Sequence, residues 1–191
     1  MPASPPYLDP DAYAVVAAAC ERLIPAVDGH PGATALGVAD YIDGLLGAFL
    51  VDPPRIYAGG PFSGRFGGEA GFAEFTPLGR LEELAWRTRI EGSAGIPERE
   101  INGPVVGWQA EYRDGIAALG ADFASVDRAE QKRRLDAVPD FRQLLYEHAC
   151  EGAYGAPEYG GNRDGQGWRA IEFPGDVQPR GYTDVEVAGR D

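Results

Sequence analysis

Apolar side chains recur every three or four residues along most of the chain, which is the period of an α-helix with one buried face. Asp9 is a good N-cap, Pro10 suits the first helical position, and Pro25 ends the run. The apolar face between these signals is formed by Tyr13, Val16, Ala17, Cys20 and Ile24. The pattern predicts a first helix within residues 8–25.

Similar stripes predict a helix in each of five further stretches, which are residues 33–50, 77–92, 103–123, 128–138 and 139–155. Gly44 and Gly47 lower the helix propensity of the first of these by about 1 kcal/mol each relative to alanine. Asp127 and Glu130 have the spacing of a capping box at the start of the fourth.

Two segments lack helical spacing, and no stretch before residue 170 alternates apolar and polar side chains as a strand does. Residues 52–76 are rich in glycine and proline but carry five aromatic rings, so we expect an ordered loop that buries its rings. Residues 170–191 are extended in pattern and punctuated by glycine, which indicates a docked C-terminal tail. The predicted fold class is all-α, a single domain over residues 1–191 with five or six helices and long loops rich in glycine, proline and aromatic residues.

The formal net charge of −13 restricts the kinds of partner. Lys132 is the only lysine, and the 30 acidic residues outnumber the 17 basic ones, so phosphate backbones and anionic membrane surfaces would repel the chain. We therefore expect no nucleic-acid partner. The most apolar stretch, 33–51, is interrupted by aspartates and glycines, so we expect no insertion into a membrane. The N-terminal sequence lacks the features of an export signal, and the expected compartment is the cytoplasm.

Motifs for cofactors, metals and nucleophilic catalysis are missing from the sequence. A phosphate-binding loop would need Gly-Lys-Ser/Thr, and a dinucleotide fold would need Gly-x-Gly-x-x-Gly between a strand and a helix. His30 and His148 have no second histidine or glutamate at metal-ligand spacing, and no Gly-x-Ser-x-Gly occurs. Cys20 and Cys150, the only cysteines, form either one disulfide or, as we favour, two buried free thiols. We expect no catalytic residue, cofactor or metal on this chain.

The stretch EYGGNRDGQGWRAIEFPG at 158–175 is the most unusual part of the sequence. Its adjacent glycines permit positive φ, and its asparagine can hold a turn by bonding nearby backbone. Its aromatic and arginine side chains have the composition of an interface hot spot or of an enzyme pocket. The alternative is that the loop only packs on its own helices, with its tryptophan as an internal anchor. Our hypothesis is a preformed docking loop over 158–169, whose candidate partner-binding residues are Tyr159, Gly160, Gly161, Asn162, Arg163, Trp168 and Arg169.

Two blocks at opposite ends of the chain resemble a known family. The first is AACERLIPAVDGHPGATALGVADYID and the second is EGAYGAPEYGGNRDGQGWRAIEFPGD, and together they frame about residues 10–176. Both are similar to the gluconate 2-dehydrogenase subunit 3 family, the small subunits of FAD-dependent sugar dehydrogenases. Residues 52–103 carry no motif that we can match.

The resemblance implies a non-catalytic small subunit that binds, stabilises or matures a large oxidoreductase subunit of the glucose-methanol-choline type. That partner would hold the FAD and the catalytic histidine. Members of the family often bring a twin-arginine signal, from which this sequence departs, so periplasmic co-export with the partner is the alternative to a cytoplasmic complex. Two other functions stay open, a self-sufficient all-α hydrolase or isomerase that uses Glu158 and Asp164, and a free-standing scaffold without an enzyme partner.

Overall fold

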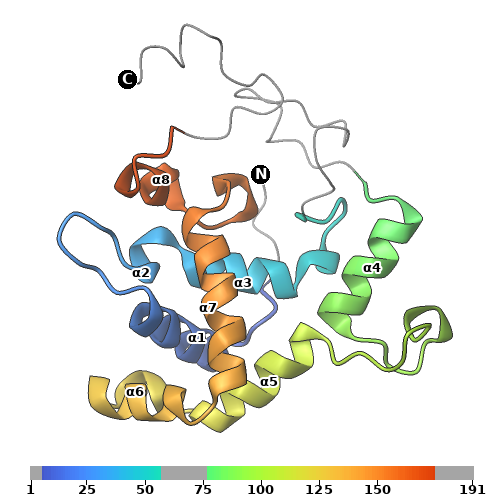
Figure 1. The fold of residues 1–191 in the computed structure, drawn as a ribbon, viewed down its shortest axis with the longest axis horizontal. Helices are drawn as coiled ribbons and strands as arrows, with labels where there is room; N and C mark the ends of the chain where they lie inside the picture. Colours follow the sequence, from blue (N-terminus) through green and yellow to red (C-terminus); the bar gives the residue numbers. More distant parts are fainter. Residues whose placement is uncertain (1–5, 57–76, 175–191) are drawn as a thin grey trace, which may run out of the picture.

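The computed structural model describes residues 6–56 and 77–174 (Figure 1). Within these ranges the chain forms no strand, only one isolated antiparallel bridge between Val27 and His30. The α-helices are α1 (Pro10–Leu23), α2 (Ala33–Leu36), α3 (Val38–Leu46), α4 (Arg80–Glu91), α5 (Trp108–Leu119), α6 (Arg128–Asp136), α7 (Pro139–Tyr154) and α8 (Gln166–Ala170). Short 3-10 helices are η1 (Ala48–Leu50), η2 (Pro97–Arg99), η3 (Phe123–Ser125), η4 (Pro157–Tyr159) and η5 (Arg163–Gly165). The all-α prediction is confirmed, although the eight α-helices of the described residues exceed the five or six expected.

Helix α1 begins where its capping signals predict. Asp9 is the N-cap, and its carboxylate accepts a hydrogen bond from the Ala12 N–H at 2.8 Å, with Pro10 as the first helical residue. The buried face consists of Val15, Val16, Ala19 and Cys20. This face is rotated slightly from the predicted stripe, so Tyr13 and Ala17 are only partly buried at its edge.

The single helix expected over 33–50 is divided into three pieces. Gly37 adopts a left-handed conformation with φ of +71°, which ends α2 and lets α3 start. Gly47 ends α3, whereas Gly44 lies inside that helix. The division accounts for part of the higher helix count.

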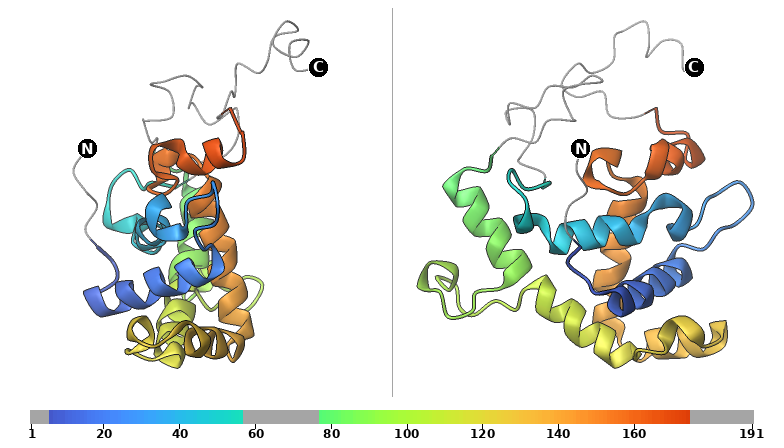
Figure 2. Two further views of the ribbon diagram at one scale, coloured as in Figure 1. Left: turned by 90° about the vertical axis from the view of Figure 1, so that its left-hand side faces the viewer. Right: turned by 180° about the vertical axis from the view of Figure 1, so that it is seen from behind.

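One hydrophobic core joins α1, α3, α5 and α7. Figure 1 shows α7 running across α3 and α1, and Figure 2 shows the same crossing from behind, in agreement with contacts of α1 and α3 to α7. The largest fully buried side chains in this core are Tyr112, Phe123, Leu36, Ile42, Leu46, Leu119 and Leu145. A smaller apolar cluster connects α4 to the end of α3 and consists of Leu45, Ala48, Ile56 and Ile90.

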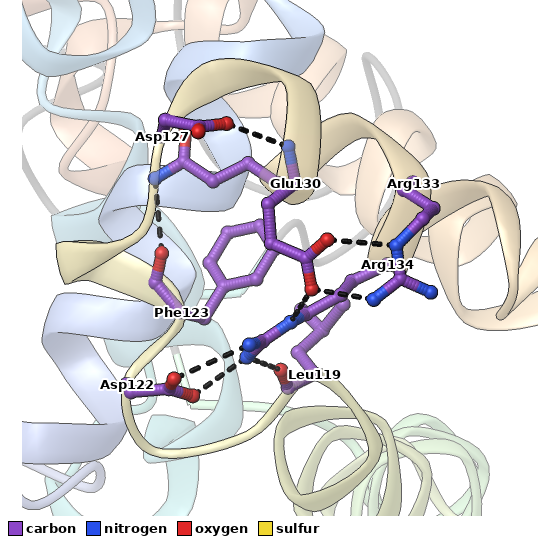
Figure 3. Close-up of polar contacts among 8 residues, drawn as sticks. Leu119, Asp122, Phe123, Asp127, Glu130, Arg133 and Arg134 are labelled. Atoms are coloured by element: carbon purple, nitrogen blue, oxygen red, sulfur yellow. Dashed lines mark hydrogen bonds and ion pairs between the residues drawn. The ribbon is translucent and has the colours of Figure 1, made fainter.

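Figure 3 shows the polar contacts that fix the start of α6. The Asp127 carboxylate accepts a hydrogen bond from the Glu130 N–H at 2.9 Å, which confirms half of the predicted capping box. The Glu130 carboxylate accepts hydrogen bonds from Arg133 and Arg134. Arg134 also donates to both oxygens of Asp122, at 2.6 and 3.2 Å. These ion pairs attach the turn before α6 to the helix itself.

Cys20 and Cys150 are both free thiols, so the disulfide alternative is wrong. Cys20 lies in the core, where burial raises the pKa of its thiol to about 12. Cys150 on α7 is only half-buried. The expectation of two buried free thiols therefore holds in full for Cys20 alone.

The two irregular segments predicted from the sequence lie mostly outside the described residues. Only 52–56 of the predicted loop over 52–76 and 170–174 of the predicted tail over 170–191 are described. The tail prediction is wrong at its start, because Ala170 ends a short helix and a turn follows it. Within the described parts of the chain, no helix combines the length and the apolar character needed to cross a membrane.

Candidate interaction site

Residues 155–173 fold back against the C-terminal end of α7, and we call this segment the clasp. It contains η4, η5 and α8, and it contacts both α3 and α7. Figures 1 and 2 show it in orange and red at one end of the molecule. Pieces of three to five residues are too short to give a periodic sequence pattern, so sequence analysis treated the clasp as a loop without helices.

Asn162 is the centre of the clasp. It is fully buried and adopts a left-handed backbone conformation, which asparagine tolerates better than most residues. Its Nδ2 donates to the Gly155 carbonyl and its Oδ1 accepts from the Gly167 N–H, both at 2.8 Å. Its backbone N–H donates to the Gly152 carbonyl at 2.6 Å, and its carbonyl accepts from the Gly165 N–H at 2.8 Å. The prediction that Asn162 holds the turn by bonding local backbone is confirmed.

The two adjacent glycines of the clasp act in different ways. Gly160 has φ of +107°, as predicted, and a Cβ there would meet no atom closer than 3.8 Å. Gly161 does not use this freedom, because its φ is not positive. Instead, a Cβ on Gly161 would lie 2.1 Å from the Gly152 carbonyl oxygen. Gly161 is therefore required because two backbone segments touch, and its burial limits any effect on a partner to the shape of the clasp.

Arg163 attaches the clasp to α3. Its guanidinium forms an ion pair with the Asp40 carboxylate, whose other oxygen accepts a hydrogen bond from the Tyr13 hydroxyl at 2.5 Å. Burial, with the hydrogen bond to Asp40, raises the pKa of Tyr13 to about 12, so this phenol stays protonated as the donor. The Arg163 side chain is still 54% exposed. It can therefore contact a partner while it holds the clasp in place.

The remaining candidate residues lie on the outer part of the clasp. Trp168 is half-buried, its Nε1 donates to the Tyr154 carbonyl at 2.6 Å, and its ring packs edge-on against Phe173 at 5.4 Å. Arg169 is exposed and donates to the Asp164 carbonyl at 2.6 Å. Tyr159 is half-buried. Trp168 therefore makes the internal contacts expected of an anchor, which was the alternative hypothesis, and is still partly exposed.

Sequence analysis missed the residues on which the clasp packs. Asp40 is 123 positions away from its ion-pair partner, and no sequence pattern connects the two. Gly152 offered a signal, because a glycine inside the predicted helix 139–155 is unfavourable unless something packs closely against it. A Cβ there would lie 2.9 Å from the Tyr41 ring. The structure thus explains this glycine by close packing of α7 on α3.

The two histidines are poorly placed for catalysis. His148 lies in the core, where its Nδ1 shares a hydrogen bond of 2.9 Å with the Tyr112 hydroxyl. Burial lowers the pKa of His148 to about 4, so the ring is neutral near pH 7. His30 lies in an exposed turn. Among residues 6–56 and 77–174, no three His, Cys, Asp or Glu side chains gather as ligands for a metal ion.

Glu158 and Asp164, the carboxylates of the alternative enzyme hypothesis, lie in different environments. Asp164 is exposed, whereas Glu158 is half-buried and its Oε2 has no hydrogen-bond partner in the described structure. Two hollows of about 430 and 450 Å³ have a size that can hold a small ligand. Neither carboxylate lines either hollow. The described hollows thus offer these two residues no shared pocket.

Comparison with known proteins identifies one match. A family model described as gluconate 2-dehydrogenase subunit 3 matches residues 10–175, which include the whole of the clasp and the central region without a recognisable motif. No curated protein and no solved structure matches the chain.

Proposed function

The chain belongs to the gluconate 2-dehydrogenase subunit 3 family, and from this premise we propose that it is a non-catalytic small subunit. It binds a large subunit of the glucose-methanol-choline oxidoreductase type and stabilises or matures it. FAD and the oxidation of a sugar or glycoside belong to that large subunit. The family description itself, a numbered subunit of a dehydrogenase, implies that a partner subunit exists.

The preformed clasp is the observation that carries this proposal. The buried Asn162 holds four backbone positions of the segment and of α7 in place. A surface that is ordered before binding loses little conformational entropy when a partner docks. Exposed on this ordered frame are Arg163 and Arg169, with parts of Tyr159 and Trp168. Tyrosine, tryptophan and arginine are the residue types that most often dominate binding energy at protein interfaces.

The ionisable groups of the described residues support an accessory role. A general acid or base works best with a pKa near the operating pH and with access to the substrate. His148 fails both requirements, because it is buried and its pKa is lowered to about 4 by that burial. Both ends of the Asn162 side chain are bonded to backbone of the clasp, and Arg163 and Asp40 are paired with each other.

Co-expression with the neighbouring reading frames tests the proposal. An affinity tag on this chain should recover a flavoprotein, and the recovered complex should show flavin absorbance and dehydrogenase activity. The purified chain alone should show neither. A stoichiometric flavin band in the lone chain would contradict the proposal, as would failure to recover any flavoprotein. The cytoplasmic location stays a prediction, which fractionation of the same cells checks.

The unpartnered Oε2 of Glu158 favours one second candidate, a self-sufficient enzyme. A buried carboxylate oxygen without a hydrogen-bond donor is an open acceptor for a substrate hydroxyl. This candidate predicts turnover of sugars by the isolated chain, with loss of turnover in Glu158→Gln and in Asp164→Asn. The absence of turnover in the isolated wild-type chain would rule out this second candidate function.

A further inference from the structure

The loop between α4 and α5, residues 92–107, is held together by a polar network and exposes four aliphatic side chains. Figure 1 shows it projecting from the edge of the molecule, at the opposite end from α8, and the view from behind in Figure 2 agrees. Sequence analysis found no motif in this region. We call residues 92–107 the α4–α5 loop.

The base of the α4–α5 loop is closed by direct contact of two backbone segments. A Cβ on Gly107 would lie 2.2 Å from the Gly92 nitrogen, so only glycine fits there. The Ser93 N–H donates to the Val105 carbonyl, and the Val105 N–H donates to the Ser93 hydroxyl oxygen, both at 3.0 Å. These contacts fix the two ends of the loop against each other.

Buried polar contacts then fill the interior of the loop. The Ser93 hydroxyl is buried and donates to Glu100 at 2.7 Å, and the Gly95 N–H donates to the same carboxylate oxygen at 3.0 Å. Arg99 donates to the Gly92 carbonyl and pairs with Glu91 of α4, both at 2.9 Å. The Arg99 side chain is only 10% exposed. The loop is therefore held in one shape by its own polar network.

Four aliphatic side chains point out from this rigid frame. Their exposed fractions are 82% for Ile101, 69% for Val106, and 40% for both Ile96 and Val105. Scattered exposed apolar residues are ordinary, but four of them on one short ordered loop are characteristic of an interaction site.

We propose that the α4–α5 loop is a second docking element that inserts Ile101 and Val106 into an apolar groove of the large dehydrogenase subunit. This inference rests on the proposed function, because it assigns the same partner. The loop lies apart from the clasp, so the large subunit would contact this chain at two separate places.

Charge argues for this occupant over a membrane surface and over a second copy of the chain. A membrane leaflet rich in anionic lipid attracts surfaces with free basic residues. Arg99, the one basic residue of the loop, is already paired with Glu91. A second copy of the chain would also carry a net charge of −13, and the two copies would repel each other. A partner of different sequence has neither disadvantage.

The test uses Ile101→Ser and Val106→Ser, with Val27→Ser as the matched control. Val27 is 59% exposed in the turn between α1 and α2, far along the chain from the loop. All three variants should melt within a few degrees of the wild type, because exposed side chains contribute little to folding. Affinity for the large subunit recovered by co-expression, purified separately, should fall about tenfold or more in each loop variant and stay unchanged in Val27→Ser.

Three outcomes would overturn the inference while leaving the proposed function standing. The first is wild-type affinity in both loop variants. The second is binding of the wild-type chain to phosphatidylglycerol vesicles that is lost in Ile101→Ser. The third is a concentration-dependent dimer of the chain alone that is lost in the same variant. Failure of the wild-type chain to bind the flavoprotein at all would overturn the proposed function and the inference together.

Discussion

Asn162 makes hydrogen bonds with both ends of its side chain, and each bond closes a different part of the clasp. Removing the side chain leaves the Gly155 carbonyl and the Gly167 N–H without partners, and places a residue other than asparagine or glycine in the left-handed region. We therefore expect Asn162→Ala to lower the free energy of unfolding by about 3 kcal/mol. Urea denaturation measures this value, with the exposed Asn102→Ala as a control that should change it by less than about 0.5 kcal/mol. Equal stability of the two variants would show that the clasp is not held by Asn162.

Arg163 has a different role at the same scale, because its ion pair with Asp40 is half-exposed. Exposed pairs contribute at most about 1 kcal/mol, so Arg163→Ala should fold with nearly unchanged stability. Its affinity for the large subunit should fall at least tenfold, because a desolvated interface arginine is worth about 2 kcal/mol or more. The matched control is Arg142→Ala, another exposed arginine with an ion pair, to Asp136. Calorimetric titration compares the two, and equal affinities would place the interface elsewhere.

His148 gives a pH prediction of definite sign. Burial lowers its pKa to about 4, below the value of about 6.5 in an unfolded chain. Between these two pH values His148 is protonated in the unfolded chain but neutral in the folded chain. The free energy of unfolding therefore falls as the pH drops from about 6.5 to 4. The loss amounts to about 3 kcal/mol over this window. Unfolding free energies at pH 7 and pH 4.5 should show a smaller difference in His148→Gln than in wild type. A wild-type difference retained in His148→Gln would contradict the assignment.

At the scale of elements, two helical glycines distinguish the effect of helix propensity on stability from the effect of close packing. Gly44 lies inside α3 with open space where a Cβ would be, so Gly44→Ala should stabilise the protein by roughly 0.5–1 kcal/mol. Gly167 lies in α8, where a Cβ would approach the Ala153 carbonyl oxygen to 2.0 Å. Gly167→Ala should destabilise the protein by about 2 kcal/mol or more, because α8 must move away from α7. Thermal melting of the two variants should therefore shift in opposite directions, and a common direction would refute the packing account.

The helices could be predicted from the sequence where they have long apolar stripes. The signals at Asp9, Asp127 and Pro139 gave the starts of α1, α6 and α7 correctly. The break at Gly37 was not predicted, because nothing in the local pattern separates a glycine that breaks a helix from Gly44, which remains inside one. Local propensity cannot distinguish the two, since the choice is made by tertiary packing.

The candidate site could be predicted only in part, for a similar reason. Glycine and asparagine favour turns by their own conformational and hydrogen-bonding properties, so the sequence predicts a rigid turn here. The pairing of Arg163 with Asp40 joins distant parts of the sequence, and the network of Ser93, Arg99 and Glu100 has no periodic pattern. Contacts of this kind become visible only when the helices are assembled.

At the scale of the whole molecule, the described residues form a helical body in which the clasp and the α4–α5 loop are two ordered segments far apart. The clasp lies at one end and the α4–α5 loop at the other. Both are stabilised by internal hydrogen bonds rather than by an apolar core of their own. This arrangement suits a subunit that presents fixed surfaces to a larger protein and leaves the chemistry to it.

The most direct test of this account is native mass spectrometry of the chain co-expressed with the flavoprotein that its affinity tag recovers. The account predicts a complex of the two subunits, and on gentle dissociation the FAD should leave with the large subunit while this chain appears at its bare mass of 20.4 kDa. FAD retained by this chain would contradict the account. So would an active flavoprotein that forms no complex with this chain under the same conditions.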